Sequence, residues 1–278
     1  MNYRLSTIND HPITMLDFIK AHAYGNDFLF VPREQVGDVD FAALARRLCD
    51  RHTGIGADGL IAYQMTPEGA SMRLRNADGS RAEVSGNGVR CLAAIVAEHH
   101  PHLRSQAIVI GTDSGDRRLT LEGQEGGRFI FRAAMGQPTS VRQVTLDVLG
   151  ERVAVVALWV GNPQCVVLGP LDEARFRRLG PALERHPAFP DGTNVEFACV
   201  EASDRVRIRI WERGVGPTEA SGTGACAAAV AAAVHGGTSR DLQVISPGGS
   251  QHVEWREDGL YLTGWAEITV AGHWLASI

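Results

Sequence analysis

The sequence lacks the features that identify several common classes of protein. Its five cysteines are odd in number and scattered, so they suggest neither a disulfide framework nor the paired spacing of zinc ligands. No apolar run approaches the roughly 18–20 residues that a membrane-spanning helix needs. The first residues, 1–14, lack the apolar core of a signal peptide. We therefore expect a protein of the reducing cytoplasm, with 1–14 as a loose N-terminal extension.

Charge and loop composition give little support to two further classes of partner. The net charge is −5 and both signs are interspersed, so no basic patch predicts binding to nucleic acid. The glycine-rich loops lack the G-x-G-x-x-G fingerprint with an acidic residue about twenty positions later, and they also lack Gly-Lys-Ser/Thr. A nucleotide-binding site is therefore a weak interpretation of these loops.

An internal duplication is the strongest pattern that is present. Ser85-Gly86-Asn87-Gly88 recurs as Ser221-Gly222-Thr223-Gly224, at an offset of 136 residues. The same offset relates 72–76 to 208–212, and Gly25-Asn26-Asp27 to Gly161-Asn162-Pro163. A register that holds at three places indicates a duplicated unit, and its period is far too long for a solenoid repeat.

The duplication predicts two similar halves, residues 15–140 and 141–278, related by a pseudo-two-fold axis. A chain of 278 residues, 44% hydrophobic and 21% charged, is long enough for two globular units. Runs 89–98 and 225–234 are apolar on nearly every side, which is typical of a helix buried inside its half.

A crossover is expected where the halves connect, and short strands are expected near the end of the chain. Residues 135–142 lack strong periodicity and contain Pro138, which favours a crossover between the halves there. Runs 260–262 and 266–270 are interpreted as two short strands near the end. These last strands are free to return to the N-terminal half.

Each Ser-Gly loop opens onto an apolar run, which is the pattern of a loop that feeds a helix N-terminus. Free backbone N–H groups and the helix dipole make such an end an anion site. If the axis brings the two loops face to face, they can hold one carboxylate between Ser85 and Ser221. Groups on opposite sides of a carbon suit removal of a proton from one face and return to the other. The pattern therefore favours racemisation without a cofactor.

Several stretches together resemble one known family, diaminopimelate epimerase, over nearly the whole chain from Met15. The matching stretches are Gly25-Asn-Asp-Phe28, Arg51-His-x-Gly-Ile-Gly-Ala-Asp58, Asn76-Ala-Asp-Gly-Ser80, Gly86-Asn-Gly-x-Arg90, Gly161-Asn-Pro163, Asn194, Glu212-Arg-Gly214, Gly222-Thr-Gly-Ala225 and Pro247-Gly-Gly249. The resemblance implies an α+β fold with two pseudo-symmetric halves, each a mixed sheet wrapped around a central buried helix.

The resemblance also implies an isomerase that interconverts LL- and meso-diaminopimelate for lysine synthesis, with no pyridoxal phosphate or metal. The residues implied to bind substrate are Asn26, Asn76, Asn162, Asn194, Glu212 and Arg213. The residues implied to hold the reacting carboxylate are Gly86, Asn87, Gly222 and Thr223. Glu212 and Arg213 suit the distal end of the substrate, where an ammonium and a carboxylate require opposite charges.

The chain departs from the family pattern at several positions, among them Gly59, where many members have a glutamine. Ser85 and Ser221 stand where the family has its two catalytic cysteines, and Gln164 stands where it has a histidine. A thiol has a pKa near 8.5, which a helix N-terminus can lower toward neutrality. Serine acts as a base only when another group takes its proton. The implied two-base proton transfer is therefore expected to be impaired.

The origin of the serines and three functions stay open from the sequence. The serines fit an engineered double variant or a natural relative that changed its chemistry. Beside the impaired epimerase stand an isomerase or dehydratase acting on another small acid, and a non-catalytic amino-acid binding protein. A small diamino-dicarboxylate is the expected ligand. The sequence does not fix the oligomeric state, and a homodimer stays open.

Overall fold

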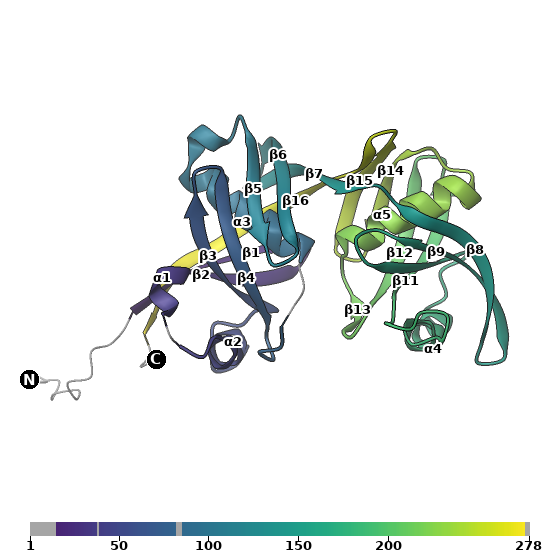
Figure 1. Cartoon of the computed structure of the whole chain (residues 1–278), viewed down its shortest axis with the longest axis horizontal. Coiled ribbons are helices and arrows are strands. Elements are labelled where there is room, and N and C mark those ends of the chain that lie inside the picture. Colours follow the sequence, from purple (N-terminus) through teal and green to yellow (C-terminus); the bar gives the residue numbers. More distant parts are fainter. Residues whose placement is uncertain (1–14, 38, 82–84, 276–278) are drawn as a thin grey trace, which may run out of the picture.

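The computed structural model describes residues 15–37, 39–81 and 85–275, which form two lobes placed side by side (Figure 1). The N-terminal lobe contains the helices α1 (Arg33–Val36), α2 (Phe41–Cys49) and α3 (Gly86–His99), and the 3-10 turn Pro101–Leu103. Its strands are β1 (Met15–Ala23), β2 (Asn26–Pro32), β3 (Gly59–Thr66), β4 (Gly69–Asn76), β5 (Ala107–Thr112), β6 (Gly115–Glu125) and β7 (Arg128–Gly136).

The C-terminal lobe follows the same plan. Its helices are α4 (Glu173–Glu184) and α5 (Gly222–Ala231), which continues as a π-helical turn, Ala232–Gly236. Its strands are β8 (Thr139–Val148), β9 (Glu151–Trp159), β10 (Pro163–Leu168), β11 (Asn194–Ala202), β12 (Arg205–Glu212), β13 (Gly216–Thr218), β14 (Asp241–Ser246) and β15 (Gly249–Arg256). The last strand, β16 (Gly259–Leu275), belongs to both lobes.

Strand pairing repeats from one lobe to the other. β2 pairs with β3 in parallel, as β10 does with β11, and β4 pairs with β5 in parallel, as β12 does with β14. In the N-terminal lobe the order β1-β2-β3-β4-β5-β6-β7-β16 closes on itself, because β16 also pairs with β1. Closure leaves no open edge in this ring of strands.

One helix occupies the core of each lobe. In α3 the eleven residues from Asn87 to Ala97 are buried, and α5 is buried from Gly224 to Ala231. The buried residues of both helices are apolar on every face apart from Asn87 and Arg90 in α3, so the surrounding strands can cover both helices. The sequence-based prediction of two buried helices is confirmed, although each begins three residues earlier than expected, at Gly86 and Gly222.

One prediction about local structure near the end of the chain is wrong. The expected short strands 260–262 and 266–270 are parts of the single strand β16, which pairs successively with β15, β7 and β1. The segment expected to carry the crossover between the halves is mostly strand, since β7 ends at Gly136 and β8 begins at Thr139. Pairing with distant strands keeps both segments extended despite their weak local pattern. Figure 1 shows the yellow β16 running from the C-terminal lobe into the N-terminal lobe.

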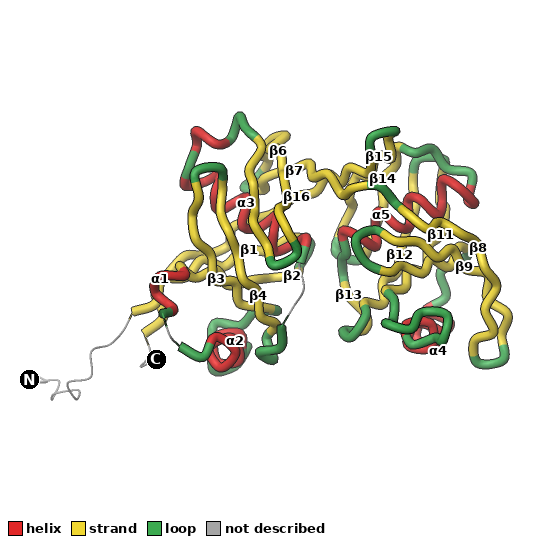
Figure 2. The backbone as a smooth tube through the Cα atoms, in the orientation of Figure 1, coloured by secondary structure: helices red, strands yellow, loops and turns green. Residues whose placement is uncertain are grey.

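None of the helices within the described ranges is long and apolar enough to cross a membrane. The backbone of both lobes is dominated by sheet (Figure 2). The fold is therefore mixed α+β, as the sequence predicts.

Candidate functional site

Ser85 and Ser221 cap the two central helices in the same way. Each has an extended backbone, with φ −102° and ψ 117° at Ser85 and φ −139° and ψ 130° at Ser221. The Ser85 hydroxyl accepts from the N–H of Gly88 at 3.1 Å, and the Ser221 hydroxyl accepts from the N–H of Gly224 at 3.2 Å. Each serine thus satisfies one N–H of the first turn and leaves those of the first two helical residues for a ligand.

The two helices meet at the boundary between the lobes. α3 and α5 contact each other, and the Arg90 guanidinium is close enough to act electrostatically on the Cys226 thiol. In Figure 2 the N-terminal ends of the two helices face one another across this boundary. Two helix N-termini that converge on one place form a site for an anion such as a carboxylate.

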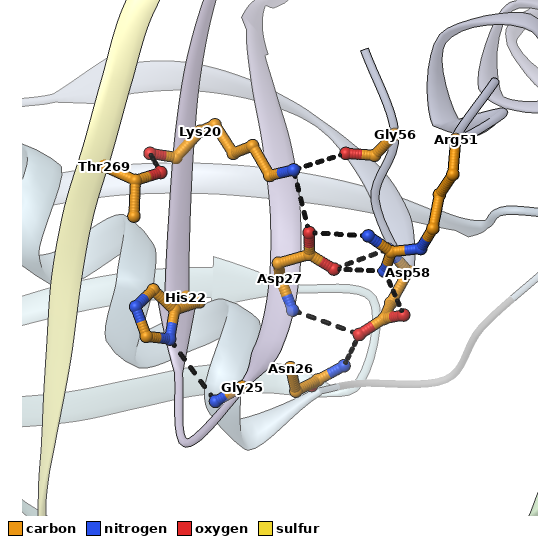
Figure 3. Close-up of polar contacts among 9 residues, drawn as sticks. All are labelled: Lys20, His22, Gly25, Asn26, Asp27, Arg51, Gly56, Asp58 and Thr269. Carbon is orange, nitrogen blue, oxygen red and sulfur yellow. Dashed lines mark hydrogen bonds and ion pairs between the residues drawn. The ribbon is translucent and has the colours of Figure 1, made fainter. Parts of the chain in front are cut away.

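Asn26 and Asn87 are joined in the N-terminal lobe. The Asn87 amide donates to Asn26 Oδ1 at 3.3 Å. Asn26 Nδ2 in turn donates to Asp58 Oδ2 at 2.8 Å (Figure 3). Asn76 lies nearby, because its partner across the β3–β4 ladder is Gly59, the residue after Asp58. The Asn76 amide donates to Ser80 Oγ at 2.9 Å.

An ion-pair network anchors the loop that carries Asn26. Arg51 Nη2 lies 2.7 Å from Asp27 Oδ1 and 2.9 Å from Asp58 Oδ1, and Lys20 Nζ lies 2.9 Å from Asp27 Oδ2 (Figure 3). Burial acts to raise the pKa of Asp27, but hydrogen bonds from Arg51 and Lys20 outweigh it and lower that pKa. Asp27 therefore stays ionised and holds the loop in place.

Asn162, Asn194 and Thr223 gather around a buried amide in the C-terminal lobe. With its amide nitrogen turned toward Glu196, Gln164 donates to both oxygens of that carboxyl group at 3.0 and 3.2 Å. Its oxygen then accepts from Thr223 Oγ1 at 3.1 Å and from Asn194 Nδ2 at 3.3 Å. In the other orientation of the Gln164 amide, its nitrogen donates instead to Asn162 Oδ1 at 2.5 Å. Gln164 therefore ties together three of the residues that the sequence singles out.

Glu212 and Arg213 lie at the end of β12, beside this cluster. The backbone N–H of Arg213 donates to Asn194 Oδ1 at 3.0 Å, and its Nη1 donates to the carbonyl oxygen of Asp191 at 3.0 Å. Burial raises the pKa of Glu212. A carboxyl group that is costly to ionise alone becomes a favourable partner for an ammonium group that shares its burial.

Glu196 is the site residue that the sequence interpretation missed. It is fully buried, and burial first, then the charge of Glu212, raises its pKa well above the ordinary value. A Cβ on Gly224 would stand 2.6 Å from Glu196 Oε1 and 3.2 Å from the Cβ of Ser221. The Glu196 carboxyl group therefore lies under the first turn of α5, next to Ser221. The sequence held one signal for this residue. Glu196 follows Asn194 by two residues in β11, so both side chains lie on the same face of the strand.

Solved structures define the class of protein to which this fold belongs. A probable proline racemase from Agrobacterium radiobacter K84 matches with a TM-score of 0.67 and 16% identity over 92% of both chains. Identity at this level establishes the fold alone. The chain thus has the two-lobed α+β fold of a structural class that contains amino-acid racemases.

Sequence relatives identify the particular family. The family model for diaminopimelate epimerase matches residues 18–141 and 156–269. The diaminopimelate epimerase of Desulforudis audaxviator is 43% identical, covering 94% of this chain and 99% of its own. That of Pelotomaculum thermopropionicum is 39% identical, covering 93% and 99%. The chain belongs to the diaminopimelate epimerase family, a family of isomerases, as the resemblance predicts.

Proposed function

We propose that this protein binds diaminopimelate between its lobes and acts as a cofactor-independent epimerase whose proton transfer is impaired. The observation that carries the proposal is the meeting of the two serine-capped helices, α3 and α5, at the lobe boundary. Their free N–H groups can hold the carboxylate next to the reacting Cα. Family membership supplies the substrate class, since the relatives are named diaminopimelate epimerases.

Each end of the substrate has a matching set of groups. Gly86, Asn87, Gly222 and Thr223 hold the reacting carboxylate. The amides of Asn26, Asn76, Asn162 and Asn194 line the two sides. Glu212 accepts the distal ammonium and Arg213 pairs with the distal carboxylate. The fixed N–H dipoles then stabilise negative charge as it develops on the reacting carboxyl group when Cα loses its proton.

Proton transfer is the step that the serines weaken. Ser85 and Ser221 occupy the positions of the family's bases, and each hydroxyl already accepts a hydrogen bond from its own helix. One cysteine lies further along each helix, Cys91 six residues after Ser85 and Cys226 five residues after Ser221. Burial raises the pKa of the Cys226 thiol to about 12 and raises that of Cys91 as well. Neither buried thiol supplies a thiolate at neutral pH, so binding persists while exchange slows.

Glu196 favours a second candidate function, an isomerase or dehydratase that uses one acid on a different small acid. The carboxyl group lies beside Ser221, while Ile61 occupies the equivalent position of the N-terminal lobe, where a Cβ on Gly88 would stand 3.0 Å from Ile61 Cδ1. Acid–base chemistry on one side only would move a proton without inverting the carbon. Glu212 and Arg213 favour diaminopimelate as the substrate, because a small acid without a distal amino-acid group would leave both side chains without a partner.

The partners and compartment of the proposed reaction are simple. The five cysteines are all free, which fits a reducing cytoplasm. The reaction as proposed needs a small-molecule substrate and no cofactor. A homodimer is compatible with this site, since both helices and both amide clusters come from one chain.

Deuterium uptake at the Cα of diaminopimelate in D2O tests the proposal. The chain is compared with its Ser85→Cys/Ser221→Cys variant, and binding to both is measured by calorimetry. We expect both to bind, and the cysteine variant to exchange at least about a hundredfold faster, since a thiolate is the competent base. Binding without exchange in either would support the non-catalytic or one-acid readings. Absence of binding in both would overturn the proposed substrate.

A further inference from the structure

Four side chains in the N-terminal lobe form one continuous line of hydrogen bonds. Arg90 Nη1 donates to Asn87 Oδ1 at 3.0 Å, and Asn87 Nδ2 donates to Asn26 Oδ1 at 3.3 Å. Asn26 Nδ2 then donates to Asp58 Oδ2 at 2.8 Å. The line links the interior of α3 to the ion-pair network at the end of β2, and it passes through two residues of the proposed substrate site.

The two ends of this line differ in chemistry in a way that fixes its direction. A guanidinium has only donors, and an ionised carboxylate has only acceptors. An asparagine amide has both, and nothing in its shape decides which end faces a neighbour. Because Arg90 can only donate, Asn87 must turn its oxygen inward. Because Asp58 can only accept, Asn26 must turn its nitrogen outward. The two charged ends therefore determine the orientation of the Asn87 and Asn26 amides.

Both ends are themselves held in place. Asp58 accepts from Arg51 Nη2 at 2.9 Å and from the backbone N–H of Asp27 at 3.1 Å (Figure 3). Arg90 is 2% exposed and lies 5.8 Å from the centre of the Tyr24 ring, measured from its Cζ. Among the described residues it has no carboxylate within ion-pair distance. A buried cation without a carboxylate partner is costly, and its retention beside Asn87 calls for an explanation.

The equivalent positions of the C-terminal lobe have neither the donor-only arginine nor the acceptor-only carboxylate. Asn162 and Thr223 correspond to Asn26 and Asn87, but Thr193 stands in the place of Asp58 and Cys226 in the place of Arg90. The amide cluster in that lobe is organised instead by Gln164 and Glu196. The directional line is therefore a property of one lobe, and the fold does not require it in both.

We propose that Asp58 and Arg90 are positioning residues that hold the Asn26 and Asn87 amides with an N–H group toward the ligand, so that the N-terminal lobe selects a carboxylate over a neutral carboxamide. After the line is made, each amide keeps one N–H that no described residue accepts. Carboxylate oxygens only accept, whereas a carboxamide also presents donors, which would meet these N–H groups unfavourably. This inference rests on the proposed function for its ligand.

Neutral amide substitutions test whether Asp58 and Arg90 set the direction of the hydrogen bonds, because they keep a hydrogen-bonding group at each end. Asp58→Asn and Arg90→Gln replace each one-way end with an amide that can both donate and accept. Calorimetry gives the dissociation constants of LL-diaminopimelate and of its diamide, and their ratio is the selectivity. In the diamide both carboxylates are replaced. The effect of the distal replacement on the ratio is the same in every variant, so it cancels when the ratios of two variants are compared.

The expected result is a coupling between two residues that do not touch. Either single variant leaves one directional end, and we expect selectivity to change by less than about threefold. The double variant leaves neither end, and we expect selectivity to fall by about tenfold or more, beyond the product of the single effects. Arg90→Lys keeps a donor-only end and should retain selectivity. A double variant with the selectivity of the native chain, or one equal to the product, would overturn the proposal.

A matched control removes the same charges elsewhere in the lobe. Glu98 and Arg104 form an exposed ion pair, with Arg104 Nη2 3.2 Å from Glu98 Oε2, near the far end of α3 from Ser85. The double variant Glu98→Gln/Arg104→Gln should leave the selectivity unchanged. If it lowers selectivity as much as the Asp58/Arg90 double variant, net charge is responsible and the positioning role is rejected.

A measurement on the free protein separates this inference from the proposed function. Side-chain amide resonances of Asn26 and Asn87 report rotation about the amide bond and exchange with solvent. We expect both to be protected in the native chain and in the Glu98→Gln/Arg104→Gln control, and exposed in the Asp58→Asn/Arg90→Gln variant. If the native chain binds neither ligand but shows this pattern, the substrate is wrong and the positioning role stands. Equal protection of the Asn26 and Asn87 amides in all three proteins would contradict the positioning role.

Discussion

Gly248 lies so close to Tyr24 that a Cβ at this glycine would stand 2.4 Å from the Tyr24 carbonyl oxygen. The Tyr24 hydroxyl also donates to the carbonyl oxygen of Ser250 at 3.0 Å and accepts from the backbone N–H of Trp265 at 3.2 Å. Tyr24 and Gly25 form the turn that directly precedes Asn26, the first residue of β2. The turn between β14 and β15 therefore abuts the loop that places Asn26 in the proposed site.

Gly248→Ala should destabilise the protein by about 2–3 kcal/mol, because the added methyl group meets main chain that cannot rotate away. Urea denaturation followed by circular dichroism measures this loss. Gly123→Ala is the control, since a Cβ at Gly123 meets nothing within 4 Å. If the two alanine variants unfold at the same urea concentration, the contact is not as tight as described.

Removal of the helix caps should lower stability without any change of charge. Ser85→Ala and Ser221→Ala each delete the hydroxyl that accepts from the third N–H of a buried helix. We expect a loss of about 1 kcal/mol in the free energy of unfolding for each. Ser105→Ala, at an exposed turn position, should have almost no effect. A loss no larger than that of the control would mean that the serines do not cap the helices in solution.

Glu196 should make the stability of the protein depend on pH. Its pKa is raised on folding, so its contribution is fully present below the ordinary pKa of glutamate and is lost as pH rises toward the folded value. Native chain and Glu196→Gln are compared by urea denaturation at pH 5 and pH 8. We expect the native chain to lose more stability over this interval, by roughly 1 kcal/mol per pH unit while only the unfolded state is ionised. Parallel pH profiles would show that Glu196 is ionised in the folded protein.

The cysteines inside the two central helices should be inert toward iodoacetamide at pH 8. Cys91 and Cys226 are fully buried, whereas Cys199 is partly exposed. Mass spectrometry after brief labelling should find modification at Cys199 well before the other two, and in urea all should react. Rapid labelling of Cys91 or Cys226 in the native protein would revive them as candidate bases in place of the serines.

The pattern of residues along the sequence predicts the two central helices and the family of this protein. The repeated Ser-Gly loops at a constant offset fixed the two helix N-termini, because a Gly-x-Gly turn before an all-apolar run has few other structures available. The apolar circumference of residues 89–98 and 225–234 showed that these helices would be buried. The same motifs identified the family, since many short matches held their spacing along the chain.

Only the tertiary structure decided what those motifs contact. Strand β16 is extended because three distant strands pair with it, and its local sequence looks like two short strands. Glu196 becomes part of the site because parallel pairing of β10 with β11 sets Gln164 opposite Asn194. The direction of the Asn26 and Asn87 amides depends on Asp58 and Arg90, which meet them through folding. Periodicity along the chain predicts which face is buried, but the partner across that face is set by strands and helices far away in sequence.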